Sequence, residues 1–267
     1  MKTTHASAIV GLLSLFCASA APATTATINY NDLWWDPNES GWGVSIAQQS
    51  STLFLTFFIY GTDSKPTWVT GQLSKTGISA IGEPIFTGDV IATTGPYYGG
   101  PFNESGVTRR RAGTVTFSPA DAVSATLTYT IDGVSVSKVV VRQTLANDDL
   151  SGNYFGVSYV GWVCPPDENA VTTHAIRGTI SHSGTQFRYE ELDGTNVCTW
   201  TGIWTQQGVL GRVDGTVSCA DGMNGTFAMS QIASSPLAVS GLLSANVTID
   251  GPQITSCTLA GKFSLLR

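Results

Sequence analysis

Two clusters of aromatic residues stand next to polar side chains. The first cluster comprises Trp34, Trp35, Asp36 and Glu39, and the second comprises Tyr97, Tyr98 and Phe102 in a Gly-rich loop. Neighbouring residues of an extended chain point to opposite sides, so we expect at least one of the two adjacent Trp side chains near the surface. An aromatic face with a few polar groups is typical of a site for a sugar or a small apolar molecule. The alternative for the Trp pair is a plug that closes one end of a barrel.

Catalytic combinations are scarce. Residues 30–144 contain no His and no Cys, which excludes a Ser-His-Asp or Cys-His mechanism there. His174 and His182, read on one strand, lie roughly 26 Å apart and cannot share a metal ion unless a turn intervenes. Carboxylates such as Glu39 and Glu104 are the remaining candidates, for acid–base chemistry on a glycoside. We expect no cofactor and no metal site, and the assignment as an enzyme stays open.

The cysteine pattern predicts disulfides. The chain has five Cys, and Cys17 lies in the N-terminal segment that we expect to be removed. The remaining four are Cys164, Cys198, Cys219 and Cys257. An even number in an exported chain indicates two disulfides, and three pairings are open. Proximity in sequence favours Cys164–Cys198 and Cys219–Cys257. A zinc site is the weaker reading, because no C-x-x-C pair is present.

The N-terminus has the features of a signal peptide. Residues 8–16 form a short apolar run, and small residues of the A-x-A kind follow up to residue 23. The run is shorter than the roughly 20 residues that a membrane-spanning helix needs, and no later segment is long enough either. Phe16 before Cys17 does not suit a lipoprotein signal. We therefore expect a secreted or periplasmic protein without a membrane span.

The charge of the chain excludes some partners. The net charge is −6 at pH 7 and only 12% of residues are charged. An acidic chain without a basic stripe argues against nucleic acid as a partner. The abundant Gly, Thr, Ser and Val favour strands and tight turns over helices.

Short strand-like segments divided by turn residues run through the whole chain. Residues 52–60 and 124–131 are β-prone, and Asp132-Gly133 predicts a tight hairpin after the second of them. Seven or eight such segments in each half predict an all-β protein with two consecutive small antiparallel meander β-barrels, similar to lipocalin or avidin. The expected domains are residues 27–146 and 149–267, after a signal peptide at residues 1–23.

Two features concern the packing of the first barrel. In lipocalin-like barrels a Trp of the first strand packs against an Arg of the last strand, and Trp42 and Arg142 resemble that structural pair. Residues 52–60 are apolar on both faces, so one face is expected in the core and the other against a ligand, the second domain or a second copy. A homo-oligomer is therefore possible.

The first half also resembles a family. Residues 32–44 (DLWWDPNESGWGV) are similar to a motif L-W-W-x-P-x-E-S-G-W-G of exported proteobacterial β proteins. The aromatic strand pair LFLTFFIYGTDSKPTWV, the segment TGPYYGGPF and the strands at residues 113–117 and 133–143 follow in the same order. The resemblance covers about residues 30–144 and implies a small bacterial β domain. It implies no activity.

Three functions follow from these observations. The first is an exported binding module for a small apolar or carbohydrate ligand, held by the two aromatic clusters. The second is a structural or protein-interaction role through the doubly apolar segment 52–60. The third is a carboxylate-dependent carbohydrate-active enzyme.

Overall fold

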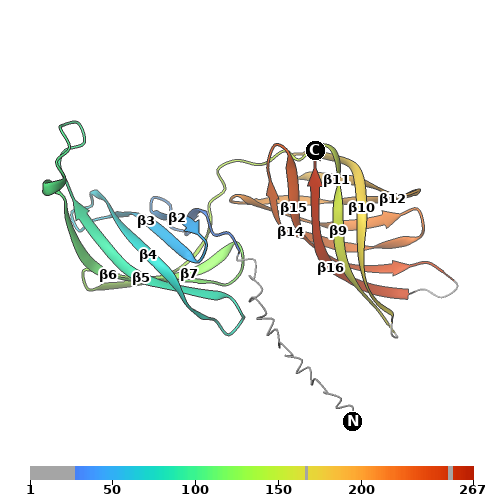
Figure 1. Cartoon of the computed structure of the whole chain (residues 1–267), viewed down its shortest axis with the longest axis horizontal. Coiled ribbons are helices and arrows are strands. Elements are labelled where there is room, and N and C mark those ends of the chain that lie inside the picture. The colour runs from blue at the N-terminus through green and yellow to red at the C-terminus, as the bar shows by residue number, and fades with distance from the viewer. Residues whose placement is uncertain (1–27, 166–167, 252–254) are drawn as a thin grey trace, which may run out of the picture.

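The computed structural model describes residues 28–165, 168–251 and 255–267. The protein consists of two closed eight-stranded antiparallel barrels, each with its strands in sequence order, which confirms the predicted fold class (Figure 1). No helix in the described ranges is long and apolar enough to cross a membrane. The expected signal peptide at residues 1–23 lies outside the described residues.

The first barrel is formed by eight short strands. They are β1 (Asp32–Trp35), β2 (Gly43–Gln49), β3 (Thr52–Tyr60), β4 (Pro66–Ile78), β5 (Pro84–Thr94), β6 (Thr108–Pro119), β7 (Ser124–Ile131) and β8 (Val134–Arg142), with a single 3-10 turn (η1, Glu104–Gly106) before β6. The four-residue strand β1 pairs with both β2 and β8 and so closes the barrel. Closure removes the unpaired edges that would otherwise invite association with other chains.

Alternation along β3 shows how the sequence builds this barrel. Leu53, Leu55 and Phe57 are fully buried in the interior, whereas Phe54 and Phe58 on the other face are about half exposed. The interior is filled by aromatic rings that meet edge to face, including Tyr30, Trp34, Phe86 and Phe117. A packed aromatic core of this kind holds the barrel together through burial and ring contacts.

The predicted pairing of Trp42 with Arg142 is wrong. The guanidinium of Arg142 lies 4.9 Å from the ring centre of Trp34. Trp34 is on β1, the strand that pairs with β8 and closes the barrel. The Arg142 guanidinium is fully buried. It donates hydrogen bonds to Asp32 Oδ2 at 3.1 Å and to the carbonyl of Ala122 at 2.7 Å. Burial lowers the pKa of Arg142, and the Asp32 carboxylate opposes that shift. Arg142 pairs with Trp34 because β1, not β2, is the strand next to β8.

Trp42 has a different partner. Its ring lies 5.1 Å from the ammonium of Lys138, and its Nε1 donates to Glu39 at 2.9 Å. The same Glu39 carboxylate forms an ion pair with Lys138. These contacts hold the loop between β1 and β2 against β8.

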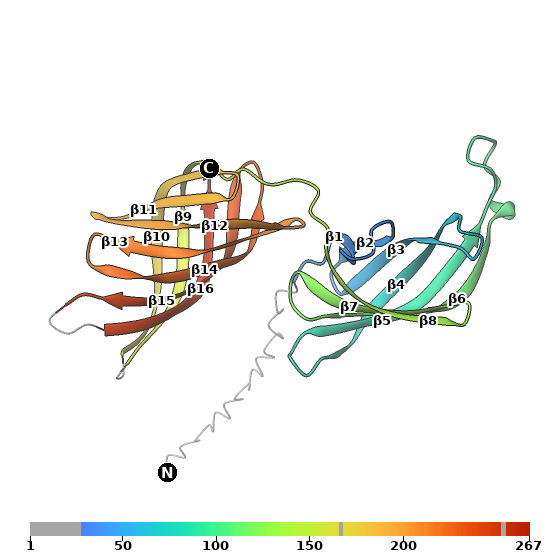
Figure 2. The same ribbon diagram turned by 180° about the vertical axis from the view of Figure 1, so that it is seen from behind.

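The second barrel has longer strands. They are β9 (Gly152–Cys164), β10 (Glu168–Ser183), β11 (Gln186–Asp193), β12 (Asn196–Gln207), β13 (Leu210–Cys219), β14 (Met223–Ser234), β15 (Ala238–Ile249) and β16 (Thr255–Leu266). β9 pairs with β10 and with β16, which closes the barrel. β11 pairs only with the second half of β10, so the hairpin of β9 and β10 extends beyond the end of β11 (Figure 2).

The disulfides are Cys164–Cys257 and Cys198–Cys219, so the pairing favoured from proximity in sequence is wrong. Cys198 and Cys219 are direct partners on the neighbouring strands β12 and β13. Barrel closure brings Cys257 on β16 beside Cys164 on β9, although 93 residues separate them. Both bridges lie at the same end of the barrel. Disulfides suit an oxidising compartment, such as the periplasm or the cell exterior.

The two barrels use the same arrangement at the start of their first strand. In the first barrel, Trp34 Nε1 donates to the carbonyl of Tyr30 and Arg142 from the last strand covers the ring. In the second barrel, the Tyr154 hydroxyl donates to the carbonyl of Leu150, and Arg267 just after the last strand lies 5.4 Å from the ring centre. An aromatic ring and an Arg thus tie the first and last strands together in each.

The barrels contact each other through the turn between β12 and β13. The amide of Val209 donates to Asp32 Oδ2 at 2.9 Å, and the amide of Gly208 donates to Thr144 Oγ1 at 3.1 Å. Gly208 has a φ of +65°, and a Cβ built on it would lie 2.1 Å from Asp32 Oδ2. Only glycine fits there without displacing the first barrel.

Candidate functional site: the lumen of the second barrel

The first predicted aromatic cluster does not form an open surface. Trp34 has no exposed area, so its assignment as a ligand-stacking residue is wrong and the plug interpretation describes it. Its indole is held inward because β1 closes the barrel and its ring packs on Phe117. Trp35 and Asp36 are partly exposed, and the carboxylate of Glu39 is engaged by Trp42 and Lys138.

The second predicted cluster lies on the loop between β5 and β6. Tyr97, Tyr98 and Phe102 are 70%, 94% and 77% exposed, and the loop projects beyond the barrel (Figure 1). The loops that carry Glu39 and Tyr98 belong to the same end of the barrel, because β1 and β5 both finish there. Side chains this exposed do not enclose a small molecule by themselves. Glu104 lies in the short turn η1 of the same loop.

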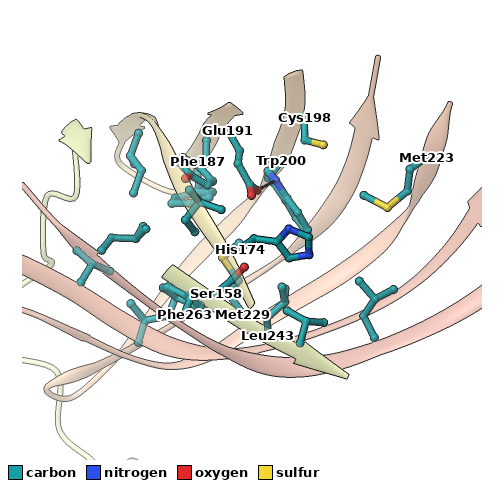
Figure 3. A pocket seen from close by; sticks show the side chains of 18 of the residues that line it. Ser158, His174, Phe187, Glu191, Cys198, Trp200, Met223, Met229, Leu243 and Phe263 are labelled. Atoms are coloured by element: carbon teal, nitrogen blue, oxygen red, sulfur yellow. Dashed lines mark hydrogen bonds between the residues drawn. The ribbon is translucent and has the colours of Figure 1, made fainter. Parts of the chain in front are cut away.

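The enclosed space lies elsewhere, inside the second barrel. A cavity of about 250 Å³ runs between its strands and is lined mostly by aliphatic, aromatic and Met side chains, among them Val160, Ile176, Phe187, Leu243 and Phe263. Figure 3 shows Phe187, Leu243 and Phe263 among the side chains that surround this space. An apolar cavity of about 150 Å³ is already large enough to hold benzene. This lumen therefore has room for a larger molecule.

Glycines on the inner face of the second barrel allow aromatic rings to lie close against its wall. A Cβ built on Gly178 would lie 2.6 Å from Tyr189 Cε2, and one built on Gly241 would lie 2.9 Å from Phe263 Cζ. Each ring thus lies over a glycine of a nearby strand. A ring that lies along the wall covers the backbone and leaves the centre of the barrel open.

One end of the lumen is closed. Leu150, Trp204 and Ile232 are buried at the end from which β9 starts, and His182 lies 5.2 Å from the ring centre of Trp204. His182 Nδ1 accepts from the amide of Leu150 at 3.2 Å and so ties the entering chain to the barrel. This closed end is the one that faces the first barrel. The opposite end of the lumen is the end that carries both disulfides.

Polar side chains are concentrated at that open end, which we call the mouth. Glu191 accepts a hydrogen bond from Trp200 Nε1 at 2.7 Å, and His174 projects into the space beside them (Figure 3). Asn196 donates to the Asp221 carboxylate at 2.8 Å. These groups line the cavity together with the second Trp of the mouth, Trp162. The mouth therefore combines aromatic rings and carboxylates, whereas the depth of the lumen is apolar.

Tyr189 is the unusual group in the wall. It is 3% exposed, and its hydroxyl is buried without a hydrogen-bond partner among the described residues. Burial raises the pKa of Tyr189 above its ordinary value, and the negative charge of Glu191 raises it further. The phenol is thus neutral at physiological pH and lacks an acceptor, a costly arrangement in a protein interior.

The described residues contain no group of three or more His, Cys, Asp or Glu side chains placed to hold a metal ion. His174 and His182, which the sequence places eight residues apart on one strand, both lie on β10. His174 lines the mouth and His182 contacts the closed end, so they belong to opposite ends of the lumen.

Comparisons with protein-family models, with curated proteins and with solved structures find no match to this chain. The protein is defined by its architecture: two closed antiparallel barrels in tandem, the first filled and the second hollow. The resemblance of the first barrel to exported proteobacterial proteins stays a prediction.

Proposed function

We propose that this chain is an exported binding protein that holds a small, mostly apolar molecule in the lumen of its second barrel. The observation that carries the proposal is the cavity of about 250 Å³ with an apolar depth, one closed end and a polar mouth. Apolar walls with a few placed polar groups are the usual composition of a small-molecule site. This site replaces the two aromatic clusters of the first barrel as the ligand-binding candidate.

A carbohydrate fits this lumen less well than an apolar molecule. A sugar carries a hydroxyl on most carbons, and each buried hydroxyl without a partner costs roughly 1–3 kcal/mol. The depth of the lumen is lined by groups such as Ile176, Val239 and Leu265, which offer no hydrogen bonds. The mouth has polar side chains for only one end of a ligand.

A pair of Ser→Phe variants tests the proposal. Ser158 faces the lumen and lines the cavity, whereas Ser218 points outward from β13. Ser158→Phe places a ring inside the cavity, so we expect the dissociation constant of an apolar fluorescent probe to rise at least tenfold. Ser218→Phe adds the same ring outside, and we expect unchanged binding. Melting temperatures of both variants exclude unfolding as the cause.

Native mass spectrometry of the protein purified from its exported fraction supplies the second test. A discrete extra mass that is lost on denaturation supports the binding function. Equal binding by both Ser→Phe variants would show that the probe sits outside the lumen and would overturn the proposal.

A second candidate function is self-association through the outer face of β3 and β4. Phe58 and Trp68 are direct partners across these strands and are 51% and 52% exposed, with Tyr60 beside them at 57%. Contiguous exposed aromatic groups are typical of interaction surfaces. Sedimentation equilibrium of the wild type and of a Phe58→Ser, Trp68→Ser variant tests it: a monomer at all concentrations rules this candidate out.

A further inference from the structure

The mouth of the second barrel carries negative charge. Glu191 and Asp221 line the cavity there, and no Lys or Arg belongs to the described residues that line it. Glu191 is at the end of β11, and Asp221 is in the turn between β13 and β14. Barrel closure brings these two segments to the same end of the lumen. A ligand that enters must pass both carboxylates.

Aromatic rings accompany the carboxylates. Trp200 donates to Glu191 through Nε1, and Trp162 donates to Thr172 Oγ1 at 2.9 Å, so both indoles are fixed by their own nitrogen. Both residues line the cavity. The face of an indole attracts organic cations, and a carboxylate beside it adds to the attraction. His174 is the only lining side chain among the described residues able to carry positive charge.

We propose that the ligand is an apolar organic cation, such as an amine or quaternary ammonium compound with a hydrophobic body, whose charged group sits at the mouth beside Trp200 and Glu191. This inference rests on the proposed binding function of the lumen and adds the class of ligand to it. The hydrophobic body occupies the apolar depth between Ile176 and Leu243. The charged group stays near the mouth, where water and the carboxylates stabilise it.

The same arrangement discriminates against apolar anions. A fatty-acid carboxylate at the mouth would lie near the carboxylates of Glu191 and Asp221. Like charges in a partly desolvated site repel more strongly than in water. An apolar anion in the reverse orientation would place its charge in the closed end, which is less favourable still.

Three probes of similar size test the proposal. They share a naphthalene ring and differ in the attached group: naphthylmethyl-trimethylammonium as the cation, methyl naphthyl ketone as the neutral form and naphthoate as the anion. Binding is measured by isothermal titration calorimetry on the full-length exported protein at pH 7. We expect the cation to bind about tenfold more tightly than the ketone, and naphthoate to bind at least tenfold more weakly than the ketone.

Two Glu→Gln variants identify the source of the preference. Glu191 faces the lumen, whereas its neighbour Glu190 points outward and is bound by Arg188. In Glu191→Gln we expect the ratio of cation to ketone affinity to fall below threefold. In Glu190→Gln, which removes the same charge on the other side of β11, the tenfold ratio is expected to persist.

The outcomes distinguish the binding function of the lumen from the chemical class of its ligand. If the ketone binds and Ser158→Phe blocks it, the binding function stands. In that case, equal affinities for cation and anion, or an unchanged ratio in Glu191→Gln, overturn the ligand class alone. If none of the three probes binds, or if Ser158→Phe binds them as the wild type does, the binding function fails and the ligand class fails with it.

Discussion

Replacing Tyr189 by Phe removes one oxygen atom and leaves the ring in its place over Gly178. The hydroxyl has no hydrogen-bond partner among the described residues and is shielded from solvent, so folding strips it of water without replacement. Such a loss costs about 1–3 kcal/mol. We therefore expect Tyr189→Phe to stabilise the second barrel, against the usual direction of a substitution in a core.

The size of the effect follows from the size of the barrel. The second barrel comprises about 115 residues, from Gly152 to Leu266. An unfolding entropy of about 2.1 cal/mol/K per residue then gives about 0.24 kcal/mol/K for the barrel. A stabilisation of about 1 kcal/mol, at the low end of the range, corresponds to a rise of about 4 °C in its melting temperature.

Differential scanning calorimetry measures this shift, and Tyr154→Phe is the matched control. The Tyr154 hydroxyl donates to the carbonyl of Leu150 at 2.9 Å and accepts from Arg267 at 2.8 Å. The same chemical change there removes the donor to the Leu150 carbonyl and one of the two acceptors of Arg267 Nη2, which also donates to the Ser151 carbonyl, so we expect a loss of about 1 kcal/mol. Opposite signs for the two variants support the reasoning. A fall in melting temperature for Tyr189→Phe would refute it, since the hydroxyl would then have a partner.

Three further predictions concern the whole chain. Because burial raises the pKa of Tyr189, the folded state keeps a proton that the unfolded state releases above about pH 10. Above that pH, we expect the free energy of unfolding to fall by about 1.4 kcal/mol per pH unit. Alkaline denaturation measures this slope, and we expect a smaller slope in Tyr189→Phe. Replacing Cys164 and Cys257 by Ser opens a loop of 93 residues, which the chain-entropy model values at about 4–5 kcal/mol in chemical denaturation; no loss would contradict it. In Gly208→Val the new side chain clashes with Asp32 of the first barrel, so we expect faster proteolysis of the segment between the barrels. Gly194→Val is the control for backbone strain, because Gly194 has a similar positive φ but open space around it.

The strand pattern made the fold class predictable. Residues 52–60 alternate between a buried and an exposed face as the sequence indicates, and the Asp132-Gly133 turn joins β7 to β8. Trp34-Trp35 was harder to assign, because a four-residue strand is too short to show alternation. Because β1 lies next to β8, Trp34 on β1 contacts Arg142. The sequence did not reveal this strand, so the prediction gave Trp42 as the partner of Arg142.

The candidate site was not predictable in the same way. Its lining residues lie mostly on seven of the eight strands of the second barrel and look like ordinary core positions in sequence. The signal that was present, glycines on the inner face such as Gly178 and Gly241, becomes meaningful only when the neighbouring ring is known. The aromatic clusters that stood out in sequence were instead a buried plug at Trp34 and an open loop at Tyr98.

The sequence by itself determined the local features of this protein: strands from their alternation, turns from Gly and Asp, and an even number of Cys from composition. These depend on neighbours along the chain. Tertiary structure alone decided which cysteines meet, that one barrel is filled and the other hollow, and that Glu191 and Asp221 share a mouth. Those outcomes depend on barrel closure, which brings together residues that are tens of positions apart and assigns each ring either a neighbour to pack against or a glycine to cover.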